Sequence, residues 1–280
     1  PNGANEDSVR CLLLYPMNAL VNDQLGRLRT LLSDKRIVDF SMSKMGRPLR
    51  FAKYTSRTPY PGFPTSAKHS QNLDQFEFFA DIERKINDES LNEQERKKFK
   101  TYLVDLKKLG KWPAKYNLSK WFGKKNERWT VKEGNFIRGN TQLNDVELLS
   151  RYEIIQNPPD LLITNYSMLN YMLIRPLEQP IFDKTQKWLS ENDNNQLVII
   201  IDEAHHLRNP TSQTHAIGPL FTKIAAFNML LSATPINLKN RDLATRDQVS
   251  RAIMKNMHDN DVDHVGLDLR YIDPEKIVER

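Results

Sequence analysis

The sequence predicts a three-layer α/β fold in which a mostly parallel β-sheet lies between two layers of helices. Three observations predict it: four short apolar runs typical of buried parallel strands, helical periodicity between them, and polar residues directly after them. The chain has 280 residues, of which 39% are hydrophobic and 27% are charged. It is therefore long enough to bury a core, and its composition is typical of globular proteins.

The first predicted strand is Val9–Tyr15, which ends at Pro16. Asn18 is expected to cap the next helix, in which leucines recur at helical spacing. The second predicted strand is Asp160–Thr164, followed by a helix that Ser167 is expected to cap. Pro176 is expected to stop that helix.

The third predicted strand, Leu197–Ile201, is the most apolar run in the chain. The fourth is Phe227–Leu231, after a helix predicted near Thr214–Ala225. Ligands of such folds bind at the carboxyl ends of the strands, so polar residues after each run are candidate site residues.

The chain between residues 60 and 150 interrupts this alternation. It is rich in lysine and aromatic residues, with a helix predicted around Asp74–Leu109 and no strong strand. We therefore predict one main domain from segments 1–60 and 140–245, with a basic aromatic insertion at 61–139. Residues 246–280 form a polar tail without an assigned structure.

Several classes of protein are disfavoured by composition. The single cysteine, Cys11, excludes an internal disulfide, and the Cys and His residues lack the spacing of a zinc site. No apolar run approaches the roughly 18 residues that a membrane span needs, and the first residues do not resemble a secretory signal. We expect a cytoplasmic protein without a membrane partner.

The strongest motif is a pair of carboxylates at the end of the third predicted strand. Asp202 is suited to hold Mg²⁺ beside nucleotide phosphates, and Glu203 to orient and deprotonate the attacking water. The alternative without catalysis is a strand that ends in a solvated acidic turn. It is disfavoured because Ala204 and His205 follow, and because a second motif lies at the end of the fourth predicted strand.

With that second motif, the sequence resembles superfamily 2 helicases. Asp202–His205 (DEAH) matches motif II and Leu231–Pro235 (LSATP) matches motif III. The resemblance implies the first RecA-like domain of a P-loop NTPase that uses ATP and Mg²⁺. It also implies catalytic roles for Asp202, Glu203 and His205, with Asp202 as the Mg²⁺ ligand, and a coupling role for Ser232, Ala233 and Thr234.

Three further segments resemble nucleic-acid-contacting motifs of the same superfamily, in the same order. They are Tyr15–Leu20 (YPMNAL), Tyr54–Pro59 (YTSRTP) and Pro159–Leu169 (PDLLITNYSML). Motif Ia, the first of these, presents backbone amides and a helix N-terminus to phosphates. The implied nucleic-acid contacts are Pro16, Asn18, Thr55, Arg57, Thr58, Thr164 and Asn165.

The resemblance within the superfamily is mixed. The YPMNAL and TNYSML segments are similar to bacterial helicases of DNA repair and of phage defence, such as the DISARM type. Residues 206–211 (HLRNPT) and 230–238 (LLSATPINL) are more similar to Snf-type translocases, which move on duplex DNA. Strand separation and duplex translocation both stay open, as does RNA in place of DNA. The implied partners are single- or double-stranded DNA, a second RecA-like domain of the same polypeptide, and other defence-system subunits.

The phosphate-binding loop GxxxxGK[ST] does not occur in these 280 residues. In the superfamily it precedes motif Ia, so we expect it just upstream of Pro1. The arginine-bearing motif of the second RecA-like domain is not found either. We therefore expect a nucleic-acid-dependent ATPase in the full-length protein, and no ATP hydrolysis by this chain alone.

The excess of cations over acids is concentrated in the insertion. Residues 96–132 contain 13 Lys or Arg against two acids, in a chain whose net charge is +6. Cations among aromatic residues favour nucleic-acid binding, and the candidates are Lys107, Lys111, Lys124 and Lys125. Two alternatives stay open: a small helical core with solvated lysines, and a docking surface for a partner subunit.

A different class of function is a non-catalytic scaffold, a helicase-like domain that binds DNA or a partner subunit without turnover. The missing phosphate-binding loop favours it. The intact Asp202, Glu203, Ser232 and Thr234 oppose it, because residues released from hydrolysis are free to change.

Overall fold

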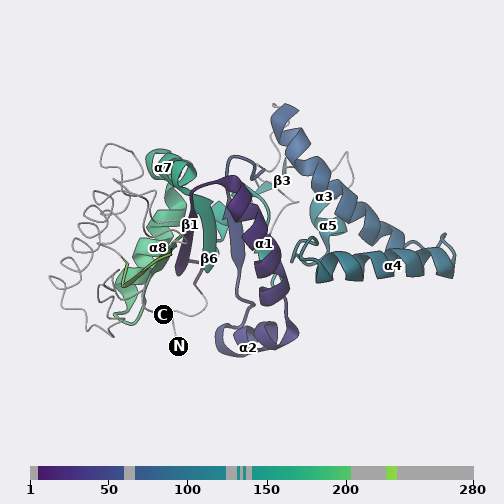
Figure 1. The fold of residues 1–280 in the computed structure, drawn as a ribbon, viewed down its shortest axis with the longest axis horizontal. Helices are drawn as coiled ribbons and strands as arrows, with labels where there is room; N and C mark the ends of the chain where they lie inside the picture. The colour runs from purple at the N-terminus through teal and green to yellow at the C-terminus, as the bar shows by residue number, and fades with distance from the viewer. Residues whose placement is uncertain are drawn as a thin grey trace, which may run out of the picture.

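A six-stranded parallel β-sheet forms the centre of the molecule, which confirms the predicted α/β fold (Figure 1). The computed structural model describes residues 6–59, 67–123, 131–132, 135–136, 141–202 and 225–231. The strand order is β5-β2-β6-β1-β7-β8, and every pairing is parallel. The strands are β1 (Cys11–Tyr15), β2 (Phe51–Tyr54), β5 (Glu147–Leu148), β6 (Leu161–Asn165), β7 (Val198–Ile201) and β8 (Phe227–Leu230).

Helices cover both faces of this sheet, and further helices extend beyond it (Figure 1). The short strands β3 (Val131–Lys132) and β4 (Asn135–Phe136) pair only with each other. The helices are α1 (Asn18–Leu32), α2 (Lys35–Met45), α3 (Ala67–Ile86), α4 (Glu93–Lys108), α5 (Leu118–Phe122), α6 (Arg151–Gln156), α7 (Tyr166–Ile174) and α8 (Gln179–Glu191). No helix in the described ranges combines the length and apolar character of a membrane span.

Alternation along β1 produces the three layers. Leu12 and Leu14 face a core shared with α7 and α8, whereas Leu13 and Tyr15 face a second core shared with α1. Successive side chains of a strand point to opposite faces, so an apolar run fills both cores at once. This explains why the parallel strands are continuously apolar rather than alternating.

Two predicted helix caps were wrong. Asn18 is the first residue of α1, and the N-cap is Met17, which makes no side-chain cap bond. The Asn18 amide oxygen instead accepts a hydrogen bond from Asn165 Nδ2 at 2.7 Å. Asn165, not Ser167, caps α7 by accepting from the backbone N–H of Met168 at 2.7 Å. One asparagine amide can serve both purposes because it carries a donor and an acceptor.

The single predicted helix over 74–109 is two helices. The chain leaves α3 after Ile86 and begins α4 after Asn92, whose side chain forms a reciprocal capping box with Glu95. An Asn followed three residues later by Glu is a start signal that was visible in the sequence. Of the helix predicted near Thr214–Ala225, residues 214–224 lie outside the described ranges, as does the tail 246–280.

Helices α3, α4 and α5 share a small core with the segment that follows them. Trp112, Trp121 and Phe122 are buried in it, together with Phe76 and Leu118. Tyr102 and Tyr116 are exposed. Three of the aromatic residues of the basic stretch are therefore core residues, which favours the helical-core interpretation for them.

Two glycines mark the contact between this helical part and α1. Gly110 has a left-handed φ of 64° and ends α4 in a Schellman motif, in which Lys111 N–H donates to Leu106 O at 2.9 Å. A Cβ built on Gly110 would lie 2.2 Å from Gly26 O. A Cβ on Gly26 would lie 3.5 Å from Gly110 O, an ordinary contact.

We expect Gly110→Ala to destabilise the 280-residue chain by about 2 kcal/mol or more, because it combines left-handed backbone strain with a main-chain clash. Gly26→Ala is the matched control, and should be neutral or stabilise by up to about 1 kcal/mol in a helix interior. Urea denaturation of the two variants and the wild type measures both changes. Equal stability of the two variants would contradict the close approach.

Candidate functional site

The carboxyl ends of the central strands lie at one edge of the sheet, and the predicted site residues follow them. Tyr54 of β2 and Leu14 of β1 both pair with Thr164 of β6, and Leu14 also pairs with Ile201 of β7. The loops after β1, β2, β6 and β7 therefore start side by side. Segments more than a hundred residues apart in sequence meet here, as expected for a ligand-binding edge of a parallel sheet.

Asp202 is half-buried directly after β7. Its backbone N–H donates to Leu14 O at 2.8 Å, and its carbonyl oxygen accepts from the Tyr166 hydroxyl at 3.1 Å. Nearby on β1, burial and, secondarily, the negative charge of Asp202 raise the pKa of Tyr15 to about 12, so this phenol stays neutral. The backbone that carries the Asp202 carboxylate is thus held by the end of the neighbouring strand β1 and by Tyr166 at the start of α7.

A single carboxylate at this place fits Mg²⁺, which takes few protein ligands beside its waters and phosphate oxygens. No group of three or more His, Cys, Asp or Glu side chains able to hold a metal occurs among the described residues. Leu231 follows β8 at the same edge, with its N–H bonded to Ile201 O at 2.8 Å. Five residues predicted for catalysis or coupling lie outside the described ranges: Glu203, His205, Ser232, Ala233 and Thr234.

The predicted contacts after β1 and β6 are in direct contact with each other. Asn18 and Asn165 share the amide hydrogen bond described above, and Pro16, two residues before Asn18, is half-buried. The Thr164 hydroxyl is fully buried and donates to Tyr54 O at 2.6 Å. The Thr164 side chain therefore links β6 to β2, because its hydroxyl hydrogen is already donated within the protein.

The loop after β2 is a compact turn that exposes one cation. Thr55 and Thr58 are each 2% exposed. The Thr58 hydroxyl donates to Lys53 O at 2.8 Å and accepts from Thr55 N–H at 2.9 Å. Arg57 lies between the two threonines and is exposed. The threonines therefore shape the turn, and Arg57 is the charged side chain that it presents to solvent.

Two buried residues that were not predicted from the sequence support this turn from the interior of the protein. Arg151 donates to Thr55 O and Thr58 O, each at 3.1 Å, and its guanidinium lies 5.1 Å from the centre of the Tyr54 ring. Glu178 is fully buried, and its carboxylate accepts from the Tyr54 hydroxyl at 2.7 Å and lies 3.6 Å from Arg151. Neither residue belongs to a recognisable motif, so only the folded chain identifies them.

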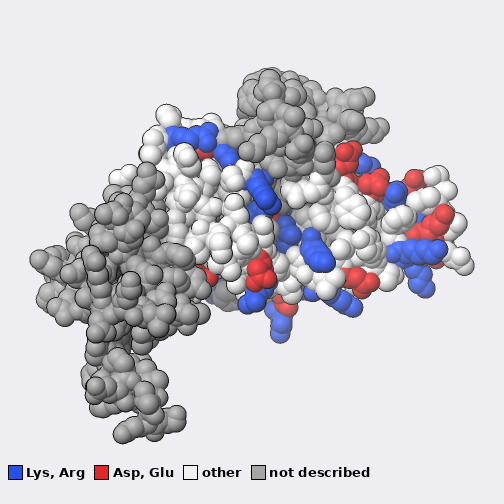
Figure 2. All heavy atoms as spheres, turned by 45° about the horizontal axis from the view of Figure 1, so that its top comes forward, with Lys and Arg blue, Asp and Glu red and all other residues white. Residues whose placement is uncertain are grey.

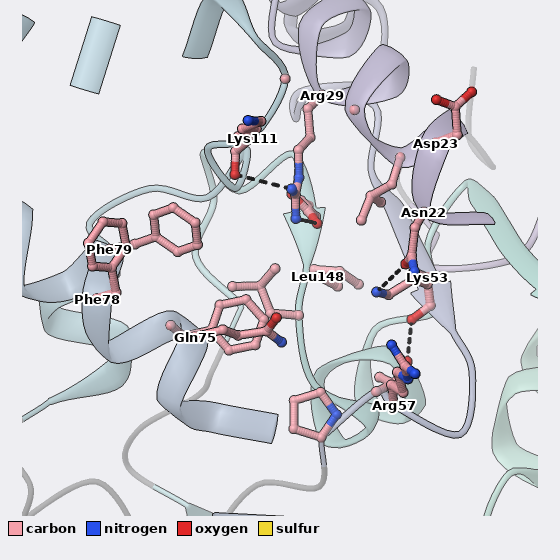
Figure 3. Close-up of a pocket in the computed structure, with 18 of the residues that line it drawn as sticks. Asn22, Asp23, Arg29, Lys53, Arg57, Gln75, Phe78, Phe79, Lys111 and Leu148 are labelled. Atoms are coloured by element: carbon pink, nitrogen blue, oxygen red, sulfur yellow. Dashed lines mark hydrogen bonds and ion pairs between the residues drawn. The ribbon is translucent and has the colours of Figure 1, made fainter. Parts of the chain in front are cut away.

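A cavity of about 800 Å³ opens between the Arg57 turn, α1 and α3 (Figure 3). In Figure 3, Lys53 and Arg57 lie on one side of it and Phe78 and Phe79 on the other. Lys111, one of the predicted nucleic-acid contacts, also lines it. Lys107 is exposed on α4 and does not line the cavity, whereas Lys124 and Lys125 lie outside the described residues.

Positive charge is also found on the surface of the molecule. Figure 2 shows Lys and Arg side chains following one another across the middle of the molecule and onto the helices beyond it, with acidic side chains among them. Lys115 is different from its neighbours, because its ammonium group is fully buried and lies 2.5 Å from both Asp145 and Glu153. One cation of the basic stretch is therefore structural rather than available to a ligand.

The chain is 38% identical over 220 residues to Druantia protein DruE of Escherichia coli (strain UMEA 4076-1). The aligned part is 74% of this chain and 11% of that relative, so the chain spans a small part of the relative's length.

A family model described as "Type III restriction enzyme, res subunit" matches residues 64–237, which is more than half of the chain. The match covers α3 to β8, and thus includes the helical part as well as Asp202 and four of the six strands of the sheet, β5, β6, β7 and β8. The parallel sheet and the polar residues at its carboxyl edge agree with a RecA-like domain. The chain therefore belongs to the helicase-like family of the type III restriction enzyme res subunit.

Proposed function

We propose that this chain is part of an ATP-dependent motor that moves on DNA. The observation that carries the proposal is the shared sheet edge, where Asp202, the Asn18–Asn165 pair and the Arg57 turn lie after neighbouring strands. A motor needs its ATP-hydrolysing residues and its DNA contacts on one rigid element, so that a conformational change caused by hydrolysis is transmitted to the bound DNA strand. The resemblance of the DEAH and SAT segments to superfamily 2 helicases supports the same assignment.

In this proposal Asp202 holds Mg²⁺, which would neutralise charge on the phosphates of ATP. Glu203 acts as the general base, and His205, Ser232, Ala233 and Thr234 couple hydrolysis to movement. The loops after β1, β2 and β6 bind the DNA backbone, so that affinity comes mainly from phosphates and sequence preference is weak. The resemblance to phage-defence helicases, together with the similarity to Druantia protein DruE, favours a role in defence.

The test is ATP hydrolysis by the longest natural polypeptide that contains this chain, with single-stranded DNA, with duplex DNA and without nucleic acid. We expect hydrolysis that DNA stimulates. Absence of turnover with any nucleic acid would overturn the motor proposal and favour the scaffold that binds DNA or a partner subunit. The preferred DNA form distinguishes strand separation from duplex translocation.

Tyr166 offers a test of coupling, because its hydroxyl joins the start of α7 to the backbone of Asp202. We expect Tyr166→Phe to reduce the DNA stimulation of ATP hydrolysis about fivefold, the equivalent of one neutral hydrogen bond. Tyr171→Phe, on the same helix but 62% exposed, is the matched control and should leave the stimulation unchanged. Equal stimulation in both variants would show that this contact does not transmit the effect.

A further inference from the structure

The cavity between α1, the turn after β2 and α3 is lined by two different kinds of side chain. Four cations line it (Arg29, Lys53, Arg57 and Lys111) against two acids, Asp23 and Glu147. Arg29 and Glu147 pair with each other at 2.7 Å, and Asp23 lies 3.5 Å from Arg27 on the same helix. Both acids are thus already engaged by arginines.

The remaining three cations are available to an anion. Within the described ranges, none of Lys53, Arg57 and Lys111 forms an ion pair with a carboxylate. The Lys53 ammonium donates instead to a neutral partner, Asn22 Oδ1, at 3.0 Å. Burial lowers the pKa of Lys53, a cost that an anion placed beside it would relieve.

The opposite side of the cavity is aromatic. Phe78 is 49% exposed although its ring is held from the side, by Phe79 at 5.5 Å and Tyr102 at 6.3 Å, both edge-to-face. Phe79 in turn packs edge-to-face on the buried Trp112 at 5.1 Å. A large apolar ring that is fixed by its neighbours yet open to a cavity is suited to stacking against a flat ligand.

We propose that this cavity binds an unpaired nucleotide of single-stranded DNA, with the base against Phe78 and the flanking phosphates beside Lys53, Arg57 and Lys111. The volume of about 800 Å³ lies within the range of sites for small organic ligands. Stacking requires an exposed base face, which a base-paired strand does not offer. The inference rests on the proposed function in one respect, namely that the ligand is nucleic acid.

Binding of fluorescein-labelled dT20 to the longest natural polypeptide containing this chain tests the stacking contact. Phe78→Leu keeps an apolar side chain against Phe79 and Tyr102 while removing the flat ring. We expect about five- to hundredfold weaker binding of dT20, in line with the loss of one base–aromatic stack. The matched control is Phe40→Leu, because Phe40 is 64% exposed on α2 and does not line the cavity.

The salt dependence separates the two sides of the cavity. Lys111→Gln should make the slope of log affinity against log salt shallower by about 0.7, as for one phosphate contact on a single strand. Phe78→Leu should leave that slope unchanged. Lys35→Gln, an exposed lysine on α2, is the control for the charge change.

Three results would overturn the inference: dT20 binding by Phe78→Leu within twofold of wild type, an equal loss for a 20-base-pair duplex, or no binding of dT20 by the wild type. ATP hydrolysis by the same polypeptide keeps this failure distinct from failure of the motor proposal. If DNA stimulates ATP hydrolysis by the wild type but Phe78→Leu binds dT20 as well as the wild type does, only the cavity assignment is refuted. If Phe78→Leu loses dT20 binding but the wild type does not hydrolyse ATP, only the motor proposal is refuted.

Discussion

Replacing Glu203 by Gln should lower DNA-stimulated ATP hydrolysis by at least about 10²-fold in the longest natural polypeptide that contains this chain. The substitution keeps the size and hydrogen-bonding capacity of the side chain but removes its ability to accept the proton of the attacking water. Asp202, the preceding residue, is anchored through its backbone to β1 and to Tyr166. The site should therefore keep its geometry, and the change should act on the chemical step.

DNA binding distinguishes this loss from a general defect. The proposed DNA contacts lie after β1, β2 and β6 rather than at Glu203, so affinity for DNA should stay within about twofold of wild type. Glu89→Gln is the matched control, because Glu89 is an exposed glutamate between α3 and α4. Turnover by the Glu203→Gln variant within a few fold of wild type would refute the general-base assignment.

Replacing Lys115 by Met should destabilise the 280-residue chain by about 3–5 kcal/mol, the usual consequence of removing one partner from a buried ionic group. The Lys115 ammonium lies 2.5 Å from Asp145 and from Glu153, and all three side chains are fully buried. Without it, two carboxylates share a dry site with no counter-charge. Urea denaturation measures the loss, and Lys120→Met is the matched control, because Lys120 is an exposed lysine on α5.

The loss of stability in Lys115→Met should depend on pH. Burial already raises the pKa of Glu153 in the wild type, and the charge of Lys115 opposes that rise. Removing Lys115 raises the folded-state pKa further, whereas the unfolded chain keeps its ordinary value. An acid with a raised folded-state pKa loses stability as pH rises, so the destabilisation should be larger at pH 8 than at pH 5. An equal loss of stability at both pH values would contradict the buried ionic contact of Lys115 with Asp145 and Glu153.

The same residue shows why the basic stretch was only partly interpretable. In the sequence Lys115 is one of 13 cations, indistinguishable from Lys107 or Lys111. In the folded chain it is a buried ion-pair partner of residues 30 and 38 positions away, whereas Lys111 lines a cavity. Asp160 is a parallel case: it lies in a segment that resembles a DNA-contacting motif, yet its carboxylate binds Arg10 and Arg47 at the amino end of β6.

Short strands mark another limit of local patterns. The bounds of the four predicted strands agree with β1, β6, β7 and β8 to within two residues at each end. Short apolar runs between helices have few conformations open to them other than a buried strand. Strands β2 and β5 were missed: β2 has four residues with Lys53 among them, and β5 has two. Their β conformation depends on hydrogen bonds to strands far along the chain, which no local window contains.

By itself, the sequence determined the fold class and the place of the chemistry. Apolar runs must be buried on both faces, and the polar residues that end them must then lie at one sheet edge. Only the tertiary structure decided which side chains reach solvent there: Arg57 is presented, while Thr55, Thr58 and Thr164 are used internally. It also decided that Phe78 faces Lys53 across a cavity (Figure 3). The physical reason is that burial and charge pairing depend on contacts between distant segments, which exist only once the sheet has formed.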